Sequence, residues 1–133
     1  MHLKLIALAD YANVSEGGKL NVMGIFSNIW ARTAPITHAQ MHLIVQFDFD
    51  FLEEGQKNFR VALVDEDGKE ILNVDGNVDV PQSGFERSTV NQIFVFQNTT
   101  FPLFGDYAFH VLFDGEGKAE IPLRVMQMKE TSA

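Results

Sequence analysis

The sequence predicts an all-β fold: a two-sheet antiparallel β-sandwich of about eight strands, immunoglobulin-like or jelly-roll-like, with a small barrel as the alternative. Apolar and polar residues alternate along most of the chain, which is the period of a β-strand. Turns rich in Asp and Gly separate the alternating runs. The chain has 133 residues, 12 Phe and no Cys, so an aromatic core can form without disulfides. We therefore expect one soluble domain over residues 1–133.

The alternation is clearest in Met41–Phe51, where every odd position is apolar and most even positions are polar. Tyr107–Phe113 and Ala119–Val125 follow the same rule. Asp65–Lys69 and Asp114–Lys118 are typical hairpin turns, because Asp and Gly tolerate the backbone angles that tight turns require. By these signals the expected strands cover residues 2–10, 19–32, 41–51, 58–65, 69–80, 88–97, 106–114 and 117–127.

The first two expected strands, 2–10 and 19–32, are less regular, because their apolar residues point to both faces. Two-sided apolarity indicates either a central position in a sheet or an outer face that another subunit covers. The second run is long for one strand, and Gly24 could bend it or form a bulge.

Charge and composition exclude several classes of function. The net charge of −8 repels phosphate backbones and anionic membrane surfaces, so we expect no nucleic-acid partner and no membrane partner. The absence of Cys excludes thiol nucleophiles and thiolate metal sites. The apolar run Leu5–Ala9 is too short for a secretory leader and is interpreted as strand.

Metal binding has one candidate arrangement. Asp48 and Asp50 share the polar face of one expected strand, and Asp75 and Asp79 share that of another. If the two strands were neighbours, these carboxylates could converge on a hard cation; otherwise they are solvated acidic faces, the commoner case. Asp65–Gly68 departs from a calcium loop and is interpreted as a hairpin turn. We expect no metal and no cofactor.

Catalytic motifs are equally sparse. His38 and His42 lie four residues apart, but no helix is expected there to bring them onto one face. The serines lack a nucleophile-elbow context, and Gly17-Gly18 precedes a strand and not the helix that a phosphate site requires. The sequence therefore favours a protein that is not an enzyme, without excluding one.

Aromatic residues near strand ends offer another kind of site. Trp30 closes the second expected strand, Phe85 lies in a polar link, and Phe101 and Phe104 flank Pro102. Exposed, these rings would serve a sugar or a protein partner; buried, they would cap the open end of the core. Tyr107 follows Gly105-Asp106, a context in which a Tyr hydroxyl can pin a corner of a sandwich.

The segments Leu8–Val14 and Glu16–Phe26 (LADYANV and EGGKLNVMGIF) resemble the N-terminal signature of a family of small uncharacterised bacterial proteins. The resemblance extends over essentially the whole chain and implies a bacterial origin and an intracellular, cytoplasmic single domain. It implies no activity, so no functional residue is carried over.

The signature has two physical interpretations. Asp10, Asn13 and Ser15 can bond their own backbone and, with Gly17-Gly18, fix a long connection between two strands. Alternatively, Asp10, Tyr11 and Asn13 form a polar binding notch. We favour the first interpretation.

These observations favour a non-enzymatic protein-interaction or assembly module, whose partner is another protein or a second copy of the chain. The alternative is a small-ligand or carbohydrate-binding module built on the loop aromatics and acidic faces. An enzyme ranks third.

Overall fold

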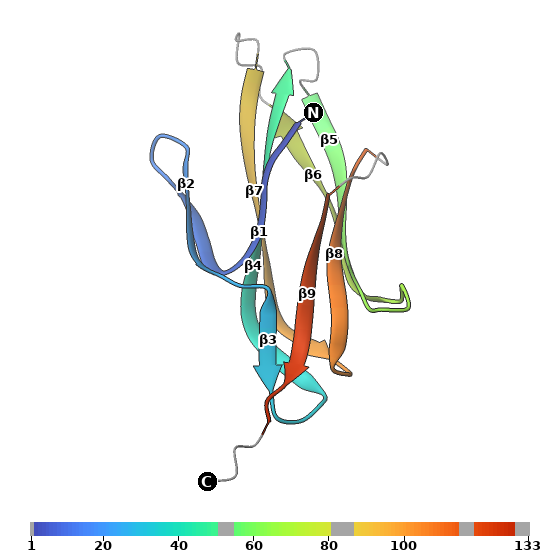
Figure 1. Cartoon of the computed structure of the whole chain (residues 1–133). Coiled ribbons are helices and arrows are strands. Elements are labelled where there is room, and N and C mark those ends of the chain that lie inside the picture. The colour runs from blue at the N-terminus through green and yellow to red at the C-terminus, as the bar shows by residue number, and fades with distance from the viewer. Residues whose placement is uncertain (1, 51–54, 81–86, 115–118, 130–133) are drawn as a thin grey trace.

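The computed structural model describes residues 2–50, 55–80, 87–114 and 119–129, and Figure 1 shows their arrangement. Within these ranges the chain is all-β and has no helix, which confirms the predicted fold class. Accordingly, no helix of the described residues is long and apolar enough to cross a membrane. The strands are β1 (His2–Ser15), β2 (Lys19–Ile25), β3 (Asn28–Ala31), β4 (Ile36–Asp50), β5 (Gly55–Val64), β6 (Glu70–Val80), β7 (Arg87–Phe101), β8 (Gly105–Phe113) and β9 (Ala119–Gln127).

The strands form two sheets that face each other as a sandwich (Figure 1). The four-stranded sheet has the order β2-β1-β4-β7, and the five-stranded sheet has the order β3-β9-β8-β5-β6. All neighbouring strands are antiparallel except β3 and β9, which are parallel. The sheets do not close on each other, so the small-barrel alternative is wrong.

The prediction of one strand over residues 19–32 is also wrong, because the chain changes sheets in this run. Gly24 adopts a φ of +71°, a left-handed conformation that bends the strand end. The amide of Phe26 still donates to the Leu8 carbonyl of the first sheet, whereas the Ser27 carbonyl accepts from Arg124 in the second. The described structure therefore has nine strands. Of the two expected strands with apolar residues on both faces, the first corresponds to β1, which is central in its sheet. The second is divided into β2 and β3, which are both edge strands.

Aromatic rings from both sheets fill the core, as the odd positions of Met41–Phe51 predicted. Phe47 from β4 meets Phe113 from β8 with ring centroids 4.0 Å apart, and Phe96 from β7 meets Phe109 at 5.2 Å. Phe47 and Phe109 are fully buried. Such edge and tilted contacts add to the hydrophobic stabilisation that burial provides.

The Asp65–Lys69 turn behaves as its composition predicts, whereas residues 115–118 of the predicted Asp114–Lys118 turn lie outside the described residues. The Asp65 carboxylate accepts hydrogen bonds from the amides of Asp67 and Lys69, each at 2.9 Å, so it closes the β5–β6 turn and the hairpin interpretation is confirmed. The Tyr107 hydroxyl donates to the Leu103 carbonyl at 2.7 Å, which is the predicted pinned corner. Burial raises the pKa of Tyr107 above its ordinary 10.0, and the Asp65 and Glu66 carboxylates act in the same direction, while the hydrogen bond that the Tyr107 oxygen accepts from the Leu103 amide opposes them.

Candidate functional site

The candidate site is a hairpin that bends away from the four-stranded sheet. We call residues 10–25, the second half of β1 together with β2, the hairpin flap. In Figure 1 the chain turns back after the middle of β1 and forms this hairpin (blue) beside the sheet. At its tip, the Gly18 carbonyl accepts a hydrogen bond from the Asn91 side chain of β7 at 3.2 Å. The flap therefore spans the outer face of β4 to reach β7.

A small apolar cluster joins the inner side of the flap to the sheet. It is separate from the main core and contains Ala9, Ala12 and Ile44, with Leu20, Val22 and Ile93 packed against it. Ile44 and Ile93 are cross-strand partners of β4 and β7. Because Leu43 and Val45 on either side of Ile44 point into the main core, the flap covers the opposite face.

The outer side of the flap is apolar and exposed. Met23 and Ile25 keep 65% and 67% of their surface accessible, and Tyr11 keeps 46%. Tyr11 pairs with Met23, and Ala9 with Ile25, across the β1–β2 ladder, so these side chains are close neighbours. The two-sided apolarity of the sequence thus has a cause: one side packs on the sheet and the other faces outward.

The signature residues hold the hairpin together instead of fixing a long connection. Residues 10–15 belong to β1, so the interpretation that we favoured is wrong in this respect. Asn21 donates from its side chain to the Asn13 side chain at 3.0 Å, and the Ser15 hydroxyl donates to the Lys19 carbonyl at 3.2 Å. Asp10 and Tyr11 are exposed on the flap, so the notch interpretation stays a prediction.

Gly24 is required where it stands. A Cβ built on it would lie 2.6 Å from the Asp10 carboxylate oxygen Oδ2, and its φ of +71° is one that side chains rarely adopt. Asp10 and Gly24 face each other at the start of the flap, so this pair sets where the hairpin bends.

His42 lies beneath the flap and is only 4% exposed. Its Nδ1 accepts a hydrogen bond from the Ala12 backbone amide at 2.9 Å, and its Nε2 lies 3.2 Å from the Gln40 side-chain amide. The Tyr11 ring packs against the imidazole with centroids 5.2 Å apart. In the sequence, His42 was considered only together with His38, as a possible pair of metal ligands. No local sequence pattern reveals its contact with Ala12.

The acidic candidates do not come together. Asp48 and Asp50 lie on β4 and Asp75 and Asp79 on β6, and these strands belong to different sheets. Asp48 is nearly buried and accepts a hydrogen bond from the Thr89 hydroxyl at 2.6 Å. Across the described ranges, no group of three or more His, Cys, Asp or Glu side chains could hold a metal ion.

The aromatic candidates divide into two groups. Phe101 is fully buried in the core, and Phe104 packs against it, as the capping interpretation predicted. Trp30 is 54% exposed on β3, so it is free to meet a ligand or partner. Phe85 lies outside the described residues.

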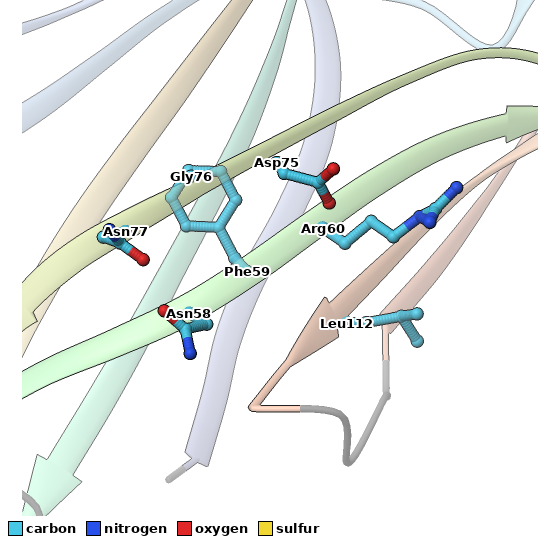
Figure 2. Close-up of a pocket in the computed structure, with 7 residues that line it drawn as sticks. All are labelled: Asn58, Phe59, Arg60, Asp75, Gly76, Asn77 and Leu112. Carbon is cyan, nitrogen blue, oxygen red and sulfur yellow. The ribbon is translucent and has the colours of Figure 1, made fainter.

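An open hollow of about 480 Å³ lies over β5, β6 and β8. Figure 2 shows Asn58, Arg60, Asp75 and Asn77 around it, with the Phe59 ring beside Gly76. Arg60 forms an ion pair with Glu70. The lining combines apolar and polar groups, and its amide and carboxylate groups could hydrogen-bond a small hydroxylated molecule.

Comparison with known proteins identifies a family but no activity. A family model described as "Family of unknown function (DUF6941)" matches residues 4–126. No curated protein matches the chain significantly. Function therefore has to be inferred from the surface of the chain itself.

The solved structures that match the chain belong to much larger proteins. A glycosyl hydrolase family 2 member from Bacteroides cellulosilyticus DSM 14838 is 14% identical over 68% of this chain and 13% of its own, with a TM-score of 0.41. A β-glucuronidase from glycoside hydrolase family 2 is 16% identical over 93% of this chain and 12% of its own, with a TM-score of 0.45. The chain thus spans a small fraction of each of these proteins.

Proposed function

The chain belongs to this family of unknown function, and from its surface we propose that it is a protein-interaction module. Its partner would add an extended segment along the free edge of β2, over the outer side of the hairpin flap. The observation that carries the proposal is the exposure of Met23 and Ile25, at 65% and 67%, on an edge strand. Exposed apolar edges are natural templates for strand addition.

The edge of β2 lacks the protection that the two edges of the five-stranded sheet have. Proteins guard edge strands with charges or by keeping them short. β6 carries Glu70, Asp75 and Asp79, and β3 has only four residues. β2 has one charged residue, Lys19, at its beginning, and the residues after it are uncharged. Such an edge is compatible with a role in which another chain covers it.

Charge indicates the chemistry of the partner. The net charge of the chain is −8, and Asp10 and Glu16 are exposed on the flap, where Lys19 is the one basic residue. A second copy would bring the same negative charge, whereas a basic segment would be attracted. We therefore take the partner to be an extended, basic segment of another protein, with apolar side chains on the face that meets Met23 and Ile25.

The proposal can be tested by nuclear magnetic resonance with a synthetic peptide in which Val and Lys alternate. We expect its addition to shift the amide signals of β2 and Tyr11, because the peptide pairs with that edge. The double variant M23K/I25K should weaken binding by about tenfold or more, since buried interface anchors are commonly worth above 1 kcal/mol each. Its stability should change by less than about 0.5 kcal/mol, as both positions are exposed.

Leu103 provides the matched control, because it is 69% exposed but lies outside the flap. L103K should bind the peptide as the unmodified protein does. A peptide with Val and Glu should bind more weakly, since its charge is repelled. The proposal is wrong if the Val–Lys peptide shifts no flap signal, and a concentration-dependent dimer through β2 would replace the basic partner with a second copy.

The alternative function, small-ligand or carbohydrate binding, would use the open hollow of Figure 2. Asn58, Asp75 and Asn77 border the hollow with Leu112 beside them, a mixture that suits a neutral hydroxylated ligand. Shifts at these residues on addition of maltose, with none at β2 on addition of peptide, would favour this function. The bacterial origin and cytoplasmic location that the resemblance implies stay predictions.

A further inference from the structure

His42 and the flap are joined by a contact that depends on the protonation state of the imidazole. Nδ1 accepts a hydrogen bond from the Ala12 amide, and an acceptor nitrogen carries no proton. The neutral ring must then carry its proton on Nε2, which lies 3.2 Å from the Gln40 side-chain amide. The amide oxygen and nitrogen of Gln40 can exchange places by a flip, so its oxygen can accept from Nε2.

We infer that His42 is a pH-sensitive latch that holds the hairpin flap closed while its imidazole is neutral. A proton on Nδ1 would turn the acceptor into a donor that faces the Ala12 N–H, another donor. A buried charge would also arise beneath the flap, at a position with 4% exposure, where an unpaired charge is costly. Opening the flap relieves both effects by admitting water.

The contacts of His42 in the described structure include no acidic side chain. From β1 it meets the Ala12 amide and the Tyr11 ring, and from its own strand the Gln40 amide. Its cross-strand neighbours are Ala9 on β1 and Val95 on β7. Tyr11 is the one titratable group among these.

Two kinds of contact besides the latch hold the flap to the sheet. The inner cluster joins Ala12, Leu20 and Val22 of the flap to Ile44 and Ile93 of the sheet. The other described contacts are the hydrogen bond from Asn91 to Gly18 at the tip and the contact of Tyr11 with His42. The latch acts together with this apolar packing, and loss of its buried hydrogen bond weakens the closed flap.

Opening would change the docking surface, since Tyr11 belongs both to the latch and to the outer side of the flap. Partner binding at β2 would then depend on pH; this consequence rests on the proposed function, whereas the latch itself does not. Histidine changes charge between about pH 5 and 8, so the latch would respond to mild acidification.

The test has two measurements on the isolated protein, with no partner present. The ¹⁵N spectrum of the imidazole at about pH 7.5 should show the proton of His42 on Nε2, with Nδ1 bare. Amide exchange of residues 11–15 and 19–25 should then be compared with exchange of core amides such as Val111. On acidification to about pH 5.5, protection of the flap relative to the core should fall by about tenfold, since protonation and opening are linked.

H42Q is the decisive variant, because a glutamine oxygen can accept from the Ala12 amide but does not titrate in this range. Its flap protection should not vary with pH relative to the core. H38Q is the matched control, since His38 lies on the same strand and packs against Phe26; it should keep the pH response. A proton found on Nδ1 at about pH 7.5, or a pH response that persists in H42Q, would overturn the latch. Failure of peptide binding with an intact pH response would refute only the proposed function.

Discussion

Gly24 illustrates how one residue determines the shape of the flap. We expect G24A to lower the free energy of unfolding by about 1–2 kcal/mol, because an alanine is strained at this φ and its Cβ would meet the Asp10 carboxylate. Urea denaturation would measure the change. D10A should be nearly neutral, since Asp10 is exposed, and G24A/D10A should recover only the part due to the contact. If G24A proved as stable as the unmodified protein, the bend would not depend on this glycine.

Tyr107 contributes to the free energy of unfolding, and this contribution decreases at alkaline pH. Because burial raises its pKa above 10.0, the unfolded chain releases the phenolic proton at lower pH than the folded chain does. The stabilisation is fully present below pH 10.0 and is lost as pH rises through the folded pKa. The difference in unfolding free energy between the unmodified protein and Y107F, measured by denaturation from neutral pH to above pH 10, should therefore shrink with pH.

At neutral pH, Y107F should itself cost about 1 kcal/mol, since the Leu103 carbonyl loses its donor. Lysine titration affects both proteins equally and cancels in the comparison, and Tyr11 is retained in both. A difference that stays constant across the alkaline range would show that the Tyr107 phenol titrates alike in the folded and unfolded chains.

At the scale of elements, the sequence predicted strands correctly where only one face of the strand is apolar. Where both faces are apolar, it did not predict where one strand ends and the next begins. Residues 41–50 of the predicted run lie within β4, and the Asp65 turn lies where its composition placed it. The prediction of one strand over residues 19–32 was wrong. A pattern with apolar residues on both faces is the same for one central strand as for β2 followed by β3. Only the backbone angle of Gly24 and the bonds of Phe26 and Ser27 to different sheets distinguish the two.

The flap shows the same limit for the candidate site. Asp10, Tyr11 and Asn13 stood out as a polar signature, and they do lie on the flap. Met23 and Ile25 were missed, because an apolar residue in a strand is expected to be buried, and their exposure follows from the edge position of β2. The contact of His42 with Ala12 joins residues 30 positions apart, and no local pattern encodes it.

For the molecule as a whole, the aromatic core should determine stability. Phe47 is 1% exposed and lies between the sheets against Phe49 and Phe113. We expect F47A to lower the free energy of unfolding by about 3–5 kcal/mol, because it removes a ring and leaves a cavity. F47L should cost less, since it refills part of the space.

The surface control for this prediction is V95A, because Val95 is 52% exposed on β7; it should change stability by less than about 0.5 kcal/mol. Denaturation followed by near- and far-ultraviolet circular dichroism would measure all three variants. Coincident transitions would show that ring packing and strands are lost together, as in a two-state transition. A near-ultraviolet transition that preceded the far-ultraviolet one would show that ring packing is lost while the strands remain, and the expectation that the aromatic core determines the stability of the strands would then be wrong.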